Sequence, residues 1–212
     1  MLTEAAESRN ATYETVDPDV RLMLQVRDGN AAAFEELVLR YQNRLITVLQ
    51  NLVHNRHRAE ELAQEVFLRV FRARASYRPE ARFATWLFTI AHNVASNALR
   101  AAARQHEVNV SADPNGEAAA KPMDSMAVAP SGLMPVRQLE KGELADVVRQ
   151  AIDSLGERQR MAVMLSRFEH MSYQDIAETM GLSVQAVKSL LSRARDNLRQ
   201  ILEPYVQEGT RP

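Results

Sequence analysis

Residues 172–191 read SYQDIAETMGLSVQAVKSLL, and this stretch decides the fold around it. Ser172 precedes a short segment with helical periodicity, and Asp175 stands three residues later, which approximates a capping box at a helix start. Gly181 follows where the chain must turn, because glycine tolerates the left-handed conformation that ends many helices. The small Ala177, the glycine four residues later and an apolar residue six after that have the spacing of a helix-turn-helix.

The second helix of this unit has a polar and basic outward face. Amide, hydroxyl and guanidinium groups can read base edges, and lysine or arginine can contact phosphates. We therefore predict that the helix-turn-helix binds duplex DNA, through Ser183, Gln185, Lys188, Ser189, Ser192, Arg193 and Arg195. A plain helical hairpin could share the glycine turn, and it is the alternative at this point.

Helical periodicity also extends over most of the remaining chain. Asp17 before Pro18 is typical of a helix start, and Asn30 can cap the next helix, whose apolar residues recur at steps of three and four. Further helices are expected at about 57–73, 83–104, 138–153, 157–168, 172–180 and 184–201. The scarcity of glycine and proline, with 7 and 8 among 212 residues, also favours an all-α fold.

The expected organisation is two small helical domains joined by a flexible linker. Four prolines and two glycines interrupt residues 107–136, which are acidic and without apolar periodicity. We expect a disordered tail at 1–17, domains at 18–106 and 137–203, and a second tail at 204–212. The lack of cysteine excludes disulfides and thiolate metal sites. No apolar run is long enough for membrane insertion, and the N-terminus is unlike a signal peptide, so a cytoplasmic protein is expected.

The net charge of −1 conceals an uneven distribution. Residues 34–106 hold eleven basic and six acidic side chains, whereas the segments on either side, 1–33 and 107–136, are both acidic. Such asymmetry suggests a polyanionic partner for the first domain, although an arginine-rich solvated helix surface would give the same count.

The first domain carries two further patterns. RFATWLFTIAHN at residues 82–93 interleaves aromatic, basic and amide side chains, which suits unstacked bases and phosphates, although Trp86 and Ile90 are favoured as core residues. On the preceding helix, Glu61, Gln64 and Glu65 share one face and could dock a basic partner helix; a solvated face is the alternative.

Together, these pieces resemble the extracytoplasmic-function (ECF) subfamily of bacterial RNA polymerase sigma factors. The resemblance covers about residues 30–202 and rests on motifs in a fixed order: AEELAQEVFLRVF at 59–71, FATWLFTIAHN at 83–93, LGERQR at 155–160, SYQDIA at 172–177 and VKSLLSRAR at 187–195. It implies a sigma domain 2-like helical bundle and a sigma domain 4-like helix-turn-helix domain. The chain would direct promoter-specific transcription initiation without being an enzyme, and would need neither cofactor nor metal.

The resemblance also implies partners and contact residues. Core RNA polymerase, through its β and β′ subunits, would contact Glu60, Glu61, Gln64, Glu65, Leu68 and Arg69. The −10 element of promoter DNA, with one flipped base, would contact Arg78, Arg82, Thr85, Thr89, His92, Asn93, Ser96, Asn97 and Arg100. The helix after Ser183 would read the −35 element, the linker would thread toward the polymerase active centre, and an anti-sigma factor would regulate the chain.

Three positions depart from the usual pattern of this subfamily. Arg58 and Asn97 stand where acidic residues are usual, and Leu190 stands where arginine is common.

Two other classes of function compete with this reading. One is a free-standing helix-turn-helix regulator that binds duplex DNA without polymerase. The other is a metal enzyme using His54 and His57, but the sequence has no His-Glu-x-x-His pattern, phosphate-binding loop or nucleophile motif, so surface histidines are favoured.

Overall fold

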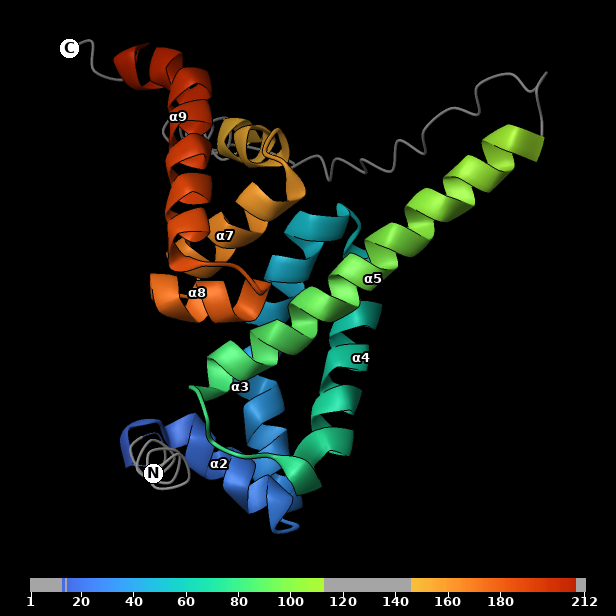
Figure 1. Cartoon of the computed structure of the whole chain (residues 1–212), viewed down its shortest axis with the longest axis vertical. Coiled ribbons are helices and arrows are strands. Elements are labelled where there is room, and N and C mark those ends of the chain that lie inside the picture. Colours follow the sequence, from blue (N-terminus) through green and yellow to red (C-terminus); the bar gives the residue numbers. More distant parts are fainter. Residues whose placement is uncertain (1–12, 14, 113–145, 209–212) are drawn as a thin grey trace, which may run out of the picture.

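The computed structural model describes Tyr13, residues 15–112 and residues 146–208, and these residues are helical apart from short connections (Figure 1). This confirms the predicted all-α fold. The elements are α2 (Pro18–Arg27), α3 (Ala31–Val53), α4 (Arg56–Ala73), a 3-10 turn (Arg74–Ser76), α5 (Phe83–Ala112), a helical segment at 146–153, α7 (Glu157–Arg167), α8 (Tyr173–Met180) and α9 (Val184–Glu208).

Local sequence chemistry starts and ends several of these helices as predicted. Asn30 Oδ1 accepts a hydrogen bond from the Ala33 amide at 3.2 Å at the start of α3. At α8, the Asp175 amide donates to Ser172 Oγ at 3.1 Å, and the Ser172 amide donates to Asp175 Oδ2 at 3.3 Å. Gly181 ends α8 in the left-handed region with φ +62°. The capping box and the glycine turn are therefore confirmed.

Three helix or tail limits differ from the prediction. α5 continues to Ala112 instead of ending near residue 104, since the next proline in the sequence is Pro114. α9 likewise continues past Pro204. Tyr13 belongs to the predicted tail, yet it packs half-buried against the core. The other expectations for residues 1–12, the linker from 113 onward and residues 209–212 lie outside the described residues.

Each half of the chain contributes its own set of buried apolar side chains. In the first, Leu37, Leu45 and Leu49 of α3 pack with α4 and with Phe83 and Leu87 of α5, and these five side chains are fully buried. Burial of each such side chain contributes about 1.5–3 kcal/mol. The second set gathers α7, α8 and α9 around Met161, Met164, Leu165, Ile176 and Val187.

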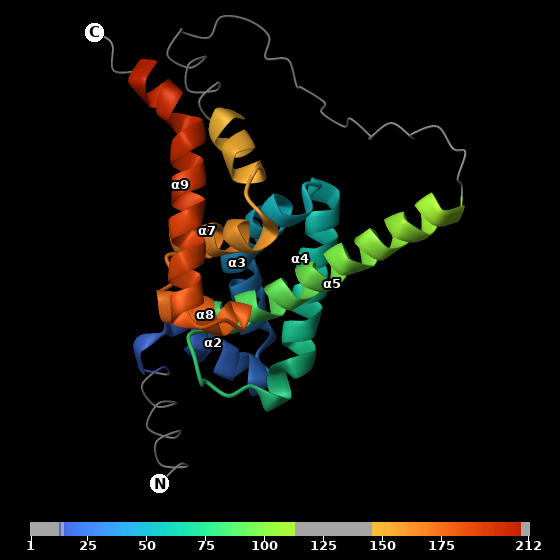
Figure 2. The same cartoon turned by 45° about the horizontal axis from the view of Figure 1, so that its top comes forward.

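The two halves pack directly against each other. α8 lies along the first half of α5, and α7 lies near the C-terminal end of α3, as both views show (Figures 1 and 2). The Glu169 side chain is only 2% exposed in this interface and forms an ion pair with Arg44 of α3. Arg160 of α7 reaches α3 as well, because its Nη1 donates to the Asn51 carbonyl at 2.9 Å.

Candidate nucleic-acid interface

The outward face of α9 is exposed to solvent. The helix turns Val187, Leu191 and Ala194 inward, where they are at most 8% exposed. This leaves the residues predicted to read duplex DNA in solvent: Ser183, Gln185, Lys188, Ser189, Ser192, Arg193 and Arg195. Ser183 also caps α9, since its Oγ accepts from the Ala186 amide at 3.2 Å. The chain can therefore present this face to a DNA groove in the arrangement seen here.

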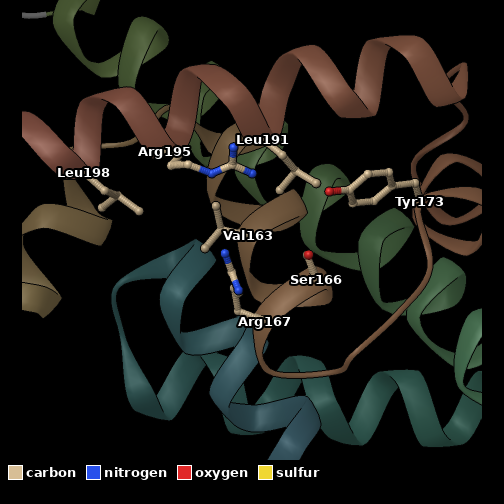
Figure 3. A pocket seen from close by; sticks show the side chains of 7 residues that line it. All are labelled: Val163, Ser166, Arg167, Tyr173, Leu191, Arg195 and Leu198. Carbon is tan, nitrogen blue, oxygen red and sulfur yellow. The ribbon is translucent and has the colours of Figure 1, made fainter.

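Arg195 differs from the other residues of this set. It lines a cavity of about 210 Å³ between α7 and α9, together with Arg167, Tyr173 and neighbouring apolar side chains. Figure 3 shows Arg195 extending from α9 above this hollow, with Arg167 on the α7 side. Arg195 therefore stands at the edge of the exposed face, beside the hollow, and not among the side chains at its centre.

The residues predicted to contact single-stranded DNA differ in accessibility. Five are exposed, namely Arg78, Arg82, Asn93, Asn97 and Arg100, and three are half-buried, namely Thr89, His92 and Ser96. Thr85 is only 1% exposed, because α8 covers it. Its Oγ1 donates to Asp175 Oδ1 at 3.1 Å, and its carbonyl accepts a long 3.5 Å bond from Thr179. Thr85 therefore cannot contact DNA while α8 stays on α5.

Two cavities border α5, and each is lined in part by residues of the second half of the chain. One, of about 330 Å³, joins His92, Asn93, Ser96 and Arg100 of α5 to Glu157 and Arg158 of α7 and to Met180 and Leu182. The other, of about 300 Å³, is lined by Tyr77, Arg78, Trp86 and Thr89 and also by Glu178 of α8. Volumes of this size are at the lower end of small-molecule sites.

Burial changes the protonation chemistry of two groups in these cavities. It lowers the pKa of His92, which favours the neutral ring. It also raises the pKa of Tyr77, whose hydroxyl has no hydrogen-bond partner among the described residues. Glu178 of α8 lines the second cavity although it stands about a hundred positions after Tyr77 in the chain. No pattern in the sequence predicts that Glu178 lies there.

The predicted polymerase-binding residues lie along one side of α4. Each of the three glutamates there already has a basic partner on the same helix: Arg56 Nε lies 2.9 Å from Glu60, Arg58 Nη1 lies 2.7 Å from Glu61, and Arg69 Nε lies 2.7 Å from Glu65. The arginine partners hold the pKa values of Glu61 and Glu65 below their usual range. Gln64 is exposed beside them, and Leu68 is 50% exposed.

The histidines considered as metal ligands have other neighbours. His54 Nδ1 lies 3.3 Å from Asp153, and His57 Nε2 lies 3.4 Å from Glu61. Within 13, 15–112 and 146–208, no group of three or more histidine and carboxylate side chains could hold a metal ion. The helices of this part of the chain are also too short or too polar to cross a membrane.

The comparisons with known proteins match both halves of the chain. The family description "Sigma-70 region 2" matches residues 37–105, and "Sigma-70, region 4" matches residues 145–198. The RNA polymerase sigma-H factor of Pseudomonas aeruginosa is 34% identical over 92% of this chain and 99% of its own length. The ECF RNA polymerase sigma-E factor of Escherichia coli K12 is 31% identical over 89% of this chain and 96% of its own.

Solved structures agree at the level of the fold. CnrH in complex with the cytosolic domain of CnrY has a TM-score of 0.62 and 23% identity, over 89% of this chain and 99% of that one. The sigma factor RpoE of Bartonella quintana, in complex with the anti-sigma factor NepR, has a TM-score of 0.58 and 23% identity, over 80% and 96%. The chain belongs to the ECF family of RNA polymerase sigma factors, which direct transcription initiation and are not enzymes.

Proposed function

We propose that this sigma factor binds core RNA polymerase and reads a promoter at two places, with α9 on duplex DNA and α5 on a separated strand. The exposed polar face of α9, placed by the Gly181 turn, is the observation that carries the proposal. This face supplies both kinds of group that duplex reading needs, base-edge donors and phosphate-binding cations. The cytoplasm, where RNA polymerase works, is the proposed location.

At the −35 element, Gln185 and Arg193 would contact base edges, and Lys188 would contact phosphate. Arg193→Ala should weaken binding of the holoenzyme to this element by roughly 1–3 kcal/mol, the cost of losing a bidentate guanine contact. A gel-shift titration of holoenzyme on the promoter measures this loss. Gln200→Ala, an exposed change farther along α9, is the matched control. An unchanged affinity with Arg193→Ala would remove this residue from the reading face.

At the −10 element, α5 and the 77–82 loop would bind the non-template strand and hold one flipped base. The cavity beside Tyr77 and Trp86 offers an aromatic wall on which a base can stack. Arg78 and Arg82 are exposed next to it and can contact the phosphates. Because α8 covers Thr85, a contact of Thr85 with the strand requires the two halves of the chain to separate.

The outer side of α4 would dock on the β′ subunit of polymerase. Its glutamates could exchange their arginine partners for basic groups of the larger protein. An anti-sigma factor is a further proposed partner, because one of the two solved structures above is a sigma factor in complex with an anti-sigma factor. Such a partner would act by holding the promoter-binding faces covered.

Size-exclusion chromatography with bacterial core RNA polymerase, followed by run-off transcription from a fragment library, tests the proposal. We expect co-elution with the polymerase and transcripts whose start sites align on shared upstream elements. Specific duplex binding by the chain alone, without co-elution, would instead favour the free-standing regulator.

A further inference from the structure

The carboxylate of Asp17 holds the starts of two helices at once. Its Oδ1 accepts from the Asp19 amide at 2.9 Å, at the start of α2. Its Oδ2 accepts from the Phe83 amide at 3.0 Å, at the first residue of α5 and 66 positions later in the chain. The first amides of a helix lack partners within the helix, and a negative charge near them is favourable.

The residue next to α5 in sequence cannot supply this acceptor. The Trp86 amide donates to the Arg82 carbonyl at 3.2 Å, so Arg82 occupies the position of the N-cap. A guanidinium group has only donors and cannot accept a hydrogen bond from a helix amide. Asp17 therefore supplies, from a distant part of the chain, an acceptor for the first amide of α5, as an N-cap side chain does for the second or third amide of an ordinary helix.

Aromatic contacts connect the start of α2 to the cavity on α5. Beside Asp17, the Asp19 carboxylate accepts from the Tyr41 hydroxyl at 2.6 Å. The Tyr41 ring packs edge-on against Phe83, with 5.2 Å between ring centroids, and Phe83 is followed by Trp86 at 6.0 Å. Because Phe83 is fully buried, a shift of its backbone moves Trp86 and the end of the 77–82 loop together.

We propose that Asp17 is a positioning residue for recognition of the −10 strand. It fixes the first turn of α5 and the adjoining loop, and through them the arginines and aromatic rings that would meet DNA. A carboxylate next to a phosphate backbone would be repelled, so Asp17 acts through Phe83 and does not itself bind the strand. The inference rests on the proposed function of α5.

The test compares three variants of the full chain, each assembled with core polymerase. Asp17→Ala removes both acceptors, and Asp17→Asn keeps one carbonyl oxygen but turns an amide group toward the other donor. Asn30→Ala is the matched control, because it removes the N-cap of α3, and the hydrogen bonds of its side chain reach only Ala33 and Gln25. The measurements are co-elution with polymerase, binding of a −35 duplex, and binding of a fluorescent single-stranded −10 oligonucleotide.

We expect Asp17→Ala to weaken oligonucleotide binding by roughly two- to thirtyfold, the range for loss of one helix cap, with the other two measurements unchanged. Asp17→Asn should fall between this variant and the wild type, and Asn30→Ala should bind the strand like the wild type. The inference is overturned if Asp17→Ala binds the strand normally, or if all three measurements fall together. A wild-type holoenzyme that does not bind the oligonucleotide would overturn the proposed function of α5 first, and the inference with it.

Discussion

The buried Arg160 side chain binds backbone carbonyls from both halves of the chain. Its guanidinium donates to the carbonyls of Ile152 at 3.1 Å, Asn51 at 2.9 Å, Asp153 at 2.6 Å and Leu155 at 2.7 Å. Three of these carbonyls lie at the end of the 146–153 helix or just beyond it, and the fourth lies near the end of α3. A cation near helix C-termini is electrostatically favourable, and here it joins the two halves of the chain.

Removing this guanidinium leaves several carbonyls without a donor. We expect Arg160→Met, which keeps the apolar stem, to lower the free energy of unfolding by about 3 kcal/mol. Arg160→Lys should recover part of the loss, because an ammonium group can serve some of the carbonyls but lacks the planar fork. Urea unfolding measures both variants. A Met variant as stable as the wild type would show that water replaces the guanidinium without cost.

At the scale of a helix, a substitution at Gly181 would test backbone strain alone, because it would not disturb the packing of other side chains. An added Cβ would meet nothing within 4 Å, so only the positive φ of 62° opposes a side chain there. Gly181→Ala should therefore destabilise the chain by about 1 kcal/mol. Gly181→Asn should cost less, because asparagine tolerates the left-handed region. Thermal unfolding of the two variants gives the order, and equal losses would contradict the assignment to strain.

The ion pairs along α4 lead to a second prediction at this scale. Arg58 donates to Glu61 at 2.7 Å and so competes with any basic group of the polymerase for that carboxylate. Arg58→Glu should raise the affinity for core polymerase by at most about fivefold, since exposed pairs contribute under about 1 kcal/mol. Arg27→Glu makes the same charge change at an exposed site on α2 and is the control. The prediction is wrong if the two variants bind alike, measured by fluorescence titration.

Sequence reasoning succeeded where the cause is local. Asn30, Ser172 and Gly181 act within a few residues of themselves, so composition and spacing were sufficient to place helix limits and the exposed face of α9. It did not succeed where partners are distant in the chain. The contact of Thr85 with Asp175 spans 90 positions, and Arg160 resembled any exposed arginine of a polar motif. Periodicity reports which side of a helix is apolar and not which other helix covers it.

At the scale of the whole molecule, the interface between the halves can be tested through one ion pair and one histidine. Glu169→Lys places a second cation against Arg44 in a buried position and should separate the halves. Opening would expose His92, which lines a cavity together with Arg100 of its own helix and with Glu157 and Arg158 of α7. Because burial lowers its pKa in the closed chain, opening should raise that pKa toward 6.5.

An NMR titration of the imidazole protons in wild type and Glu169→Lys measures this rise. The same linkage gives a sign for pH dependence. The open chain binds the His92 proton more readily, so the closed arrangement is unaffected well above pH 6.5 and loses stability as the pH falls below it. Glu35→Lys, an exposed change on α3, should leave the titration unchanged. An identical His92 titration in Glu169→Lys would mean that the ion pair does not hold the halves together.

α8 covers Thr85, whereas the outward face of α9 stays exposed. The DNA contacts proposed for α9 and for Thr85 therefore become available in a fixed order during the search for a promoter. On the proposed function, a closed chain can present α9 to a double helix while Thr85 stays covered by α8. The exposed arginines of α5 and the 77–82 loop can meet a polyanion in either arrangement. We expect selectivity to come partly from this order, because a contact of Thr85 with the strand forms only after the halves have separated.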